Sequence, residues 1–278
     1  MSNIASKSNL AESSNETIED RKLKEIEWSD FRRTLTKEED GADFDKYTAN
    51  LKYYCIIDKQ TEEIKQWLIA NTKGKDVFEM ACGNTAMLPH VAGIVRTAVA
   101  ADIAPVTIEL AKNSAKGNPD LEKIDYRVMD CEKTGLPDNS FDVILEQGAL
   151  HHMDLDAAYK EAARLLRPGG KFFCLEAIRH NPVIHLYRRL TPHLRTAWEV
   201  DHILGQPQVM KGLEYFNKIE KKHYYIVSII AVPFRNTKLF KPLLAVLEGI
   251  DAVLTRIPGM QWLAWQCWFV LSEPKNKQ

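Results

Sequence analysis

The stretch VFEMACGNT, residues 77–85, decides the fold class, because a short apolar run leads directly into a turn of small and polar residues. Such a run, bounded by a turn signal, is typical of a buried strand. Comparable apolar runs follow at 98–101, 124–129, 141–145 and 171–176, and segments of helical spacing separate them. This alternation predicts an α/β fold with a mostly parallel sheet and helices on both faces.

The expected helices alternate with these strands, since their apolar residues recur at helical spacing. The helical segments are 56–71, 85–95, 105–115, 155–167 and 237–255. Two further strands are expected at 223–232 and 264–271. Because they close the chain after a parallel core, we expect them to form an antiparallel hairpin at the edge of a seven-stranded sheet.

Three segments lie outside this alternation. Residues 178–222 contain three prolines and are expected to form an irregular, partly helical insertion. Residues 1–20 are rich in Ser, Asn and Glu, so we expect a disordered tail. Residues 21–75 are charged but carry aromatic groups, and we expect a helical lid on a domain that spans 76–278.

The overall charge narrows the classes of function. The 278 residues carry 37 Lys and Arg against 38 Asp and Glu, which gives a net charge of −1. A chain this balanced has no general attraction to nucleic acid or to an anionic membrane. The 45% of hydrophobic residues are enough to bury a core without disulfides or metals.

Cysteine usage and hydropathy predict a cytoplasmic protein. The five cysteines are odd in number and form no CxxC pair, which argues against zinc sites and disulfides and favours a reducing compartment. The first residues contain no apolar signal-peptide core. The longest uncharged stretch, 257–272, is shorter than the roughly 20 residues that a bilayer span needs.

The ends of the first two predicted strands carry groups suited to a ligand. In open α/β sheets, ligands lie beyond the carboxyl ends of the strands, where small residues such as Gly83 let the backbone approach. Asp102 ends the second strand 23 residues after Glu79. That spacing is near the roughly 20 residues at which an acid accepts hydrogen bonds from ribose hydroxyls. Taken alone, the small residues are equally typical of an ordinary strand-to-helix turn, and Asp102 is equally typical of a solvated acid at the end of a strand.

Six motifs in order are far more specific than any one of them. They are EMACGNT (79–85), AADIAP (100–105), MDCE (129–132), LPDNSFDVIL (136–145), GALHHM (148–153) and LLRPGGKF (165–172). Residues 77–176 therefore resemble the UbiE-like, type 11 family of class I S-adenosylmethionine-dependent methyltransferases. Ala81 and Thr85 stand where that family usually has glycines. The resemblance implies a Rossmann-like fold and S-adenosylmethionine as the cofactor.

The resemblance also implies which residues hold the cofactor. Glu79 and Gly83 would lie near its methionine part, and Asp102 would bind its ribose. Ile103 would lie against the adenine, whose amino group Asp130 would contact. The full implied set is Glu79, Ala81, Gly83, Asp102, Ile103, Asp130, Cys131, Glu146 and Gln147.

The implied reaction is an in-line SN2 transfer of the methyl group, in which positioning supplies much of the acceleration. A base is needed when the acceptor is a hydroxyl or a protonated amine, and histidine is the commonest. The candidates are His152 and His151, directly after the fourth strand, and Tyr187 in the insertion.

The insertion also carries the clearest indication of the substrate. Residues 177–198 contain four arginines, three histidines and no acid. Arginine suits phosphate or carboxylate groups, whereas a solvated basic face is the alternative. The candidates for contacting the substrate are Arg188, Arg189, Tyr54 and His180. The last third of the chain is apolar, which is typical of core packing, of a pocket for a hydrophobic acceptor, or of a peripheral contact with a membrane.

We therefore predict methyl transfer to a small hydrophobic molecule that carries an anionic group, such as a lipid, a polyprenyl or a secondary metabolite. A nucleic-acid or protein methyltransferase and a non-catalytic cofactor-binding protein remain alternatives, the latter because two motif glycines are replaced. Methylation of base amino groups typically uses an Asp/Asn-Pro-Pro-aromatic motif, where this chain has EQGA at 146–149. An NAD(P)-dependent dehydrogenase would need a GxGxxG turn, which 79–85 lacks.

Overall fold

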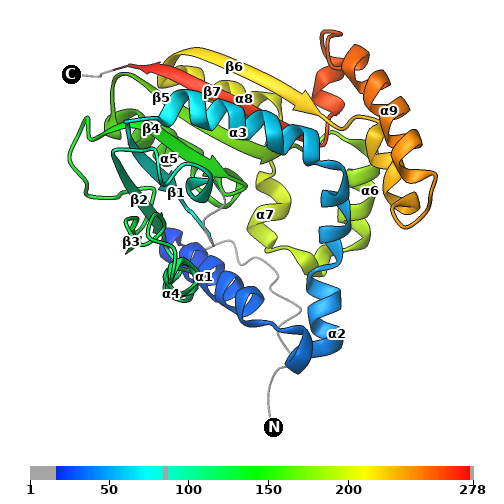
Figure 1. Ribbon diagram of the computed structural model, residues 1–278, viewed down its shortest axis with the longest axis horizontal. Helices are drawn as coiled ribbons and strands as arrows, with labels where there is room; N and C mark the ends of the chain where they lie inside the picture. Colours follow the sequence, from blue (N-terminus) through cyan, green and yellow to red (C-terminus); the bar gives the residue numbers. More distant parts are fainter. Residues whose placement is uncertain (1–16, 84–86, 276–278) are drawn as a thin grey trace.

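A seven-stranded sheet forms the centre of the part of the chain that the computed structural model describes, residues 17–83 and 87–275 (Figure 1). Its strands lie in the order β3-β2-β1-β4-β5-β7-β6. Their bounds are β1 Asp76–Met80, β2 Thr97–Asp102, β3 Asp125–Val128, β4 Phe141–Gln147, β5 Leu166–Ala177, β6 Phe216–Tyr224 and β7 Gln266–Pro274. β7 runs antiparallel to β5 and β6, whereas the other neighbours are parallel. The predicted fold class is confirmed.

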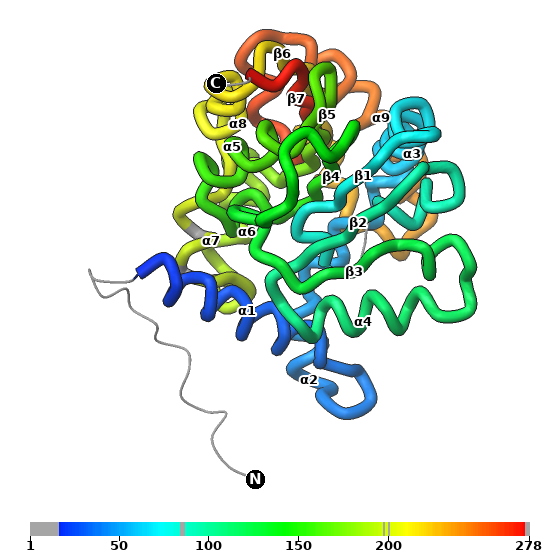
Figure 2. Tube along the Cα trace, turned by 90° about the vertical axis from the view of Figure 1, so that its left-hand side faces the viewer, coloured from blue at the N-terminus to red at the C-terminus, as the bar shows by residue number. Residues whose placement is uncertain are grey.

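Helices connect the strands and flank the sheet (Figures 1 and 2). The α-helices are α1 Ile18–Thr34, α2 Lys37–Tyr47, α3 Asp58–Thr72, α4 Pro105–Ala115, α5 Leu155–Leu165, α6 Pro182–Leu190, α7 Ala197–His202, α8 Gln206–Lys211 and α9 Phe240–Leu254. The 3-10 turns are η1 Ala49–Ile56, η2 Leu88–His90, η3 Leu150–His152, η4 Pro192–Leu194, η5 Gly212–Glu214, η6 Ser228–Phe234 and η7 Met260–Leu263.

Successive side chains of the central strands enter two different cores, because neighbouring residues of a strand point to opposite faces. Val77 packs with Leu68 of α3 in one core. Phe78, the next residue, packs with Tyr159 of α5 in the other. All four side chains are fully buried. The sheet is therefore covered on both faces, which leaves the ends of its strands as the place for a site.

The prediction of a helix over 85–95 is wrong for residues 87–95, the part that the structure describes. Residues 87–95 form only the 3-10 turn η2 and further turns, while residues 84–86 lie outside the described residues. The backbone N–H groups of Met87 and Leu88 donate to the carboxylate of Glu79, at 2.9 and 3.2 Å. A buried acid on β1 therefore fixes this segment close to the sheet, and Gly93 disfavours continuation as a helix.

The strand predicted over 223–232 begins earlier and ends sooner. It is β6, and its last residue is followed by Tyr225, whose φ of 67° is incompatible with a strand. The buried carboxylate of Asp251 then accepts three successive backbone N–H groups, at residues 226–228. These hydrogen bonds turn the chain away from the sheet after β6. Since β6 begins at Phe216, the segment between β5 and β6 ends there and not at residue 222.

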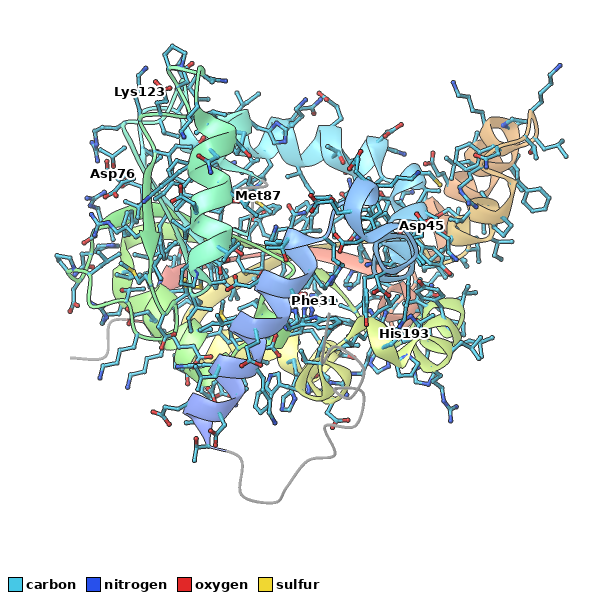
Figure 3. All side chains as sticks on the ribbon, turned by 90° about the horizontal axis from the view of Figure 1, so that it is seen from below. Phe31, Asp45, Asp76, Met87, Lys123 and His193 are labelled. Carbon is cyan, nitrogen blue, oxygen red and sulfur yellow. The ribbon has the colours of Figure 1, made fainter. Side chains whose placement is uncertain are left out.

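Helices α1 and α2 lie below the sheet in Figure 1 and cross the face seen in Figure 3, where Phe31 marks α1. α1 begins with a capping box, in which Thr17 and Asp20 bond reciprocally to each other's backbone N–H groups. The predicted tail falls largely on residues 1–16, outside the described residues. None of the helices in the described part is both long and apolar enough to span a bilayer.

Candidate active site

A cavity of about 870 Å³ lies beyond the carboxyl ends of β1, β2 and β4. Of the residues predicted to hold a cofactor, those that line it are Ala81, Gly83, Asp102, Ile103, Asp130, Cys131 and Gln147. Helix α1 contributes the facing residues Arg21, Lys22, Glu25, Trp28, Ser29, Arg32 and Arg33. The cavity therefore lies between the carboxyl ends of the strands and α1, a position at which α/β folds bind ligands.

Glu79 and Glu146 are not among the residues that line this cavity, and the contacts resolved for them support its loops. Glu79 holds the segment after β1 through the two hydrogen bonds described above. Glu146 Oε1 accepts the N–H groups of Ala149 and Leu150, at 2.5 and 3.2 Å, and so fixes the turn after β4. Both carboxylates are buried.

The turn after β1 requires small residues. Ala81 and Gly83 both have positive φ, 47° and 54°, which favours residues with little or no side chain. A Cβ atom on Gly83 would lie 2.6 Å from Nη2 of Arg33. The carboxylate of Asp102 accepts the N–H groups of Gly83 and Ala104, each at 2.9 Å. Since a carboxylate has about four acceptor positions, Asp102 retains capacity for hydroxyl groups of a ligand.

Ion pairs fasten α1 over the cavity. Lys22 Nζ lies 2.7 Å from Asp130 and 2.9 Å from Glu132, and Arg21 lies 2.6 Å from Glu132. Glu132 is largely buried, so these pairs are shielded from solvent more than ordinary surface pairs. Asp130, a predicted cofactor residue, thus also anchors the helix that covers the site.

The turn after β4 places His151 in a buried network of acids. His151 Nδ1 lies 2.8 Å from Oε2 of Glu176, whose other oxygen accepts the N–H of Leu150 at 2.7 Å. Burial, together with the charge of Glu176, raises the pKa of Glu146 well above its usual range. Burial also acts to raise the pKa of Glu176, but the charge of His151 and its hydrogen bond outweigh it and lower the pKa. Burial thus favours the neutral form of Glu146, whereas His151 favours the ionised form of Glu176.

His152 is paired with α1 instead. Its Nδ1 lies 2.9 Å from Oε2 of Glu25, whose Oε1 accepts the hydroxyl hydrogen of Thr196 at 2.7 Å. Burial alone would lower the pKa of His152, but the hydrogen bond and charge of Glu25 outweigh it and raise the pKa to about 9. His152 is consequently an imidazolium at neutral pH that ties α1 to the sheet.

Replacing His152 by Gln is expected to flatten the dependence of stability on pH between pH 7 and pH 10. The folded pKa of about 9 exceeds the unfolded value of about 6.5, so the stabilisation is complete below pH 6.5 and is lost as pH rises through 9. It amounts to roughly 2 kcal/mol for a side chain that is 29% exposed. Urea denaturation at both pH values measures it, with His193→Gln as the control. If the wild type and both variants lost the same stability between pH 7 and pH 10, the pairing of His152 with Glu25 would be contradicted.

A second cavity of about 490 Å³ adjoins the first. Five residues line both cavities, namely Arg32, Leu51, Gln147, Gly148 and His152. Tyr53, Tyr54, Tyr187 and Trp265 form aromatic walls of the second cavity, where Tyr53 packs edge-on against Tyr187 and Trp265. The buried hydroxyl of Tyr187 has no hydrogen-bond partner among the described residues.

Arg188 contributes a largely buried positive charge to the second cavity. Its Nη1 donates to the carbonyl of Ile178 at 3.1 Å, and no carboxylate in the described ranges forms an ion pair with it. Burial, reinforced by neighbouring Arg195, lowers the pKa of Arg188 to about 10. Arg195 itself lies 3.3 Å from Glu199. A largely buried guanidinium without an acidic partner is costly, which is typical of a site that receives an anion.

The structure separates the predicted substrate residues into two groups. Arg188, Tyr187 and Tyr54 line the second cavity. Arg189 and His180 are exposed and line neither cavity, because Arg189 follows Arg188 on a helix and faces outward. Glu25 and Arg32 reach the site from α1 and were not predicted from the sequence. The capping box at Thr17 could have located α1, but no local signal shows what its side chains contact.

His151, His152 and Glu199 are the described residues that come closest to a metal-binding group. One ligand atom from each lies within 4.8 Å of the others. Glu176, Glu25 and Arg195 already engage these three side chains. With the guanidinium of Arg188 lining the same cavity, the arrangement favours an anion over a cation.

Residues 78–174 match the model of a family described as "Methyltransferase domain". The chain is 37% identical over 82 residues to the ubiquinone/menaquinone biosynthesis C-methyltransferase UbiE of Rickettsia akari. The aligned region covers 28% of this chain and 33% of that protein. Over 147 residues it is 25% identical to an eEF1A lysine and N-terminal methyltransferase homolog of Drosophila pseudoobscura pseudoobscura, covering 49% of this chain and 21% of that protein. The chain thus spans a third or less of the length of these two relatives.

The fold also matches solved structures. Phosphoethanolamine N-methyltransferase 2 of Haemonchus contortus superposes with a TM-score of 0.56 at 15% identity, covering 82% of this chain and 58% of that one. At this identity the match concerns the fold alone, which agrees with the order of the strands. The family match and the UbiE relatives confirm the predicted resemblance: residues 78–174 form a methyltransferase domain similar to those of the class I S-adenosylmethionine-dependent methyltransferases.

Proposed function

We propose that this protein transfers a methyl group from S-adenosylmethionine to a small molecule that combines an apolar body with a phosphate or carboxylate group. The observation that carries the proposal is the pair of adjoining cavities, the first bordered by the methyltransferase motifs and the second by Arg188. Gln147, Gly148 and His152 border both, so the reacting atoms would meet beside these residues.

The first cavity has the residues that the cofactor requires. Asp102 can accept both ribose hydroxyls, and Ile103 and Cys131 offer apolar surface for the adenine. Gly83 and Gly148, both with positive φ, expose backbone to the methionine part. The sulfonium group of the cofactor supplies an electrophilic methyl group. Solved relatives support this assignment, since the Haemonchus enzyme was crystallised with S-adenosylhomocysteine.

The second cavity suits an amphiphilic acceptor. Arg188 and the buried Tyr187 hydroxyl can donate hydrogen bonds to an anionic group, and charge-assisted bonds of this kind are strong in a low dielectric. Tyr53, Tyr54 and Trp265 offer apolar surface for the body of the molecule. Named relatives support both halves: UbiE is a C-methyltransferase of quinone biosynthesis, and the Haemonchus enzyme was crystallised with phosphomonomethylethanolamine.

Of the predicted bases, His151 is the one best placed to take a proton from an acceptor hydroxyl or ammonium group. Glu176 accepts from Nδ1, which leaves Nε2, 4.0 Å from Oε1 of Glu199, to accept a proton on the cavity side. His152 is already protonated at neutral pH, and burial raises the pKa of Tyr187, so it stays a phenol and donates. As the acceptor atom bonds to the methyl carbon and the carbon–sulfur bond breaks, His151 gains the proton and Glu176 stabilises the imidazolium.

The proposal is tested by incubating the protein with methyl-labelled S-adenosylmethionine and a bacterial extract separated into lipid, small-molecule, protein and nucleic-acid fractions. Label is expected in an anionic member of the lipid or small-molecule fractions. For an acceptor that must lose a proton, His151→Ala is expected to reduce labelling about 100-fold or more, while His185→Ala, an exposed histidine, leaves it unchanged. Label confined to protein or nucleic acid would overturn the proposed substrate class.

A further inference from the structure

The polarity of helix α9 differs from that of an ordinary surface helix, because its acid is buried and several of its apolar side chains are exposed. Of its 15 residues, Asp251 is the one that is buried, and its carboxylate accepts the N–H groups of residues 226–228 and the hydroxyl of Ser228. On its outer side, Val246 is 63% exposed, Ile250 43% and Val253 60%. A helix that buries its acid and exposes its apolar residues is suited to an apolar environment.

The exposed apolar surface continues on the neighbouring elements. Ile184 of α6, Ile229 of η6 and Leu244 of α9 pack into one shared cluster, which brings the three elements together. Both α6 and α9 lie at the right-hand end of the molecule in Figure 1. Their exposed apolar residues form what we term the α6–α9 face, comprising Val183, Leu186, Leu190, Ile230, Phe234, Leu239, Val246, Ile250 and Val253.

The charges carried by α6, η6, α9 and the turns beside them are mostly positive. The exposed cations are Arg189, Arg235, Lys238, Lys241 and Arg256, and no ion pair with a described carboxylate engages any of them. Acids within α6, η6, α9 and the turns between the last two are limited to the inward-facing Asp251 and to Glu248. Burial raises the pKa of Glu248, and the five exposed cations outnumber this one partly exposed acid.

We propose that the α6–α9 face rests on an anionic lipid bilayer, with α9 lying in the interface. Apolar residues bordered by Lys and Arg are the pattern of interfacial helices, and each cation near an anionic surface strengthens the binding. At 15 residues, α9 is about 22 Å long, so it lies on the membrane and does not cross it. A second copy fits the face less well, because an isologous contact would bring like charges together.

This orientation also places the second cavity close to the bilayer. Tyr187 and Arg188 line that cavity, whereas Leu186 and Leu190 of the same helix belong to the α6–α9 face. An amphiphilic acceptor could therefore enter from the membrane past α6. This route of delivery rests on the proposed function, but the membrane contact itself does not.

Cosedimentation with vesicles tests the contact. The full chain is expected to bind vesicles of an equal mixture of phosphatidylglycerol and phosphatidylcholine, and to bind pure phosphatidylcholine at least about tenfold more weakly. The double variant Val246→Asp/Ile250→Asp is expected to lose at least about tenfold in affinity for the mixed vesicles. The double variant Ile69→Asp/Val128→Asp, whose sites are equally exposed but lie on α3 and β3, should bind like the wild type.

Two further measurements keep the outcomes distinct. Binding of S-adenosylhomocysteine by each variant reports an intact fold and the cofactor site independently of the membrane. Light scattering reports association between copies. Failure of the wild type to bind the mixed vesicles, equal losses in both double variants, or a wild-type dimer that Val246→Asp/Ile250→Asp dissociates would each overturn the proposal. Loss of methyl transfer with vesicle binding intact would count only against the proposed function.

Discussion

Replacing Asp102 by Ala is expected to weaken the binding of S-adenosylhomocysteine by about 100-fold or more. Hydrogen bonds to a charged group contribute about 1.5–3 kcal/mol each, and two bonds to ribose hydroxyls reach that effect at about 1.4 kcal/mol per factor of ten. The substitution also releases the N–H groups of Gly83 and Ala104, which shape the turn against the cofactor. Isothermal titration calorimetry measures the change in affinity.

A matched control lies at the opposite end of the same sheet. Asp76 is also a buried acid, but it pairs with Arg96 and Arg167 at the amino end of β1, far from the first cavity. Those hydrogen bonds, led by that from Arg96, hold the pKa of Asp76 far below its usual range. Asp76→Ala should therefore lower stability and leave affinity unchanged. Equal affinities for Asp102→Ala and wild type would remove Asp102 from the site.

Replacing Arg188 by Met is expected to lower methyl transfer about 100-fold and yet to stabilise the folded protein by about 1 kcal/mol. The loss follows from removal of a charge-assisted, two-pronged contact with the anionic group. The gain follows because a largely buried guanidinium without an acidic partner opposes folding, whereas a thioether of similar length does not. The lost hydrogen bond to the carbonyl of Ile178 limits the gain.

Urea denaturation and methyl labelling of the same preparations check both halves of this expectation. Inorganic pyrophosphate serves as a probe of the anion site and should raise the melting temperature of the wild type but not of Arg188→Met. Arg189→Met, on the exposed side of the same helix, should change stability by less than about 0.5 kcal/mol and leave transfer intact in assays without membranes. A strongly destabilised Arg188→Met protein would mean that Arg188 serves the fold and not an anion.

The sheet could be predicted because its signals are local. The runs at 98–101 and 141–145 are apolar and end at turn residues, and β2 and β4 lie there. The failures have non-local causes. The buried acids Glu79 and Asp251 each take backbone N–H groups that a helix at 85–95 or a strand at 223–232 would have used. No pattern within a short segment reveals such partners.

The residues of the candidate site likewise fall into those that local sequence predicts and those that depend on distant partners. Gly83 and Asp102 lie in motifs next to their strands, so sequence spacing placed them at the cavity. Glu25 meets His152 across more than a hundred residues of sequence, and the direction in which Arg188 and Arg189 point depends on how α6 packs. The inverted polarity of α9 could not be read from composition, because an apolar helix in a sequence is equally typical of a core element.

The measurement that decides most directly between a methyltransferase and its alternatives is calorimetric titration of the wild-type protein with S-adenosylhomocysteine and, separately, with NADH. We expect one molecule of S-adenosylhomocysteine to bind per chain, with heat that Asp102→Ala abolishes, and we expect no binding of NADH. Binding of NADH without S-adenosylhomocysteine would contradict the assignment of the first cavity and, with it, the proposed reaction.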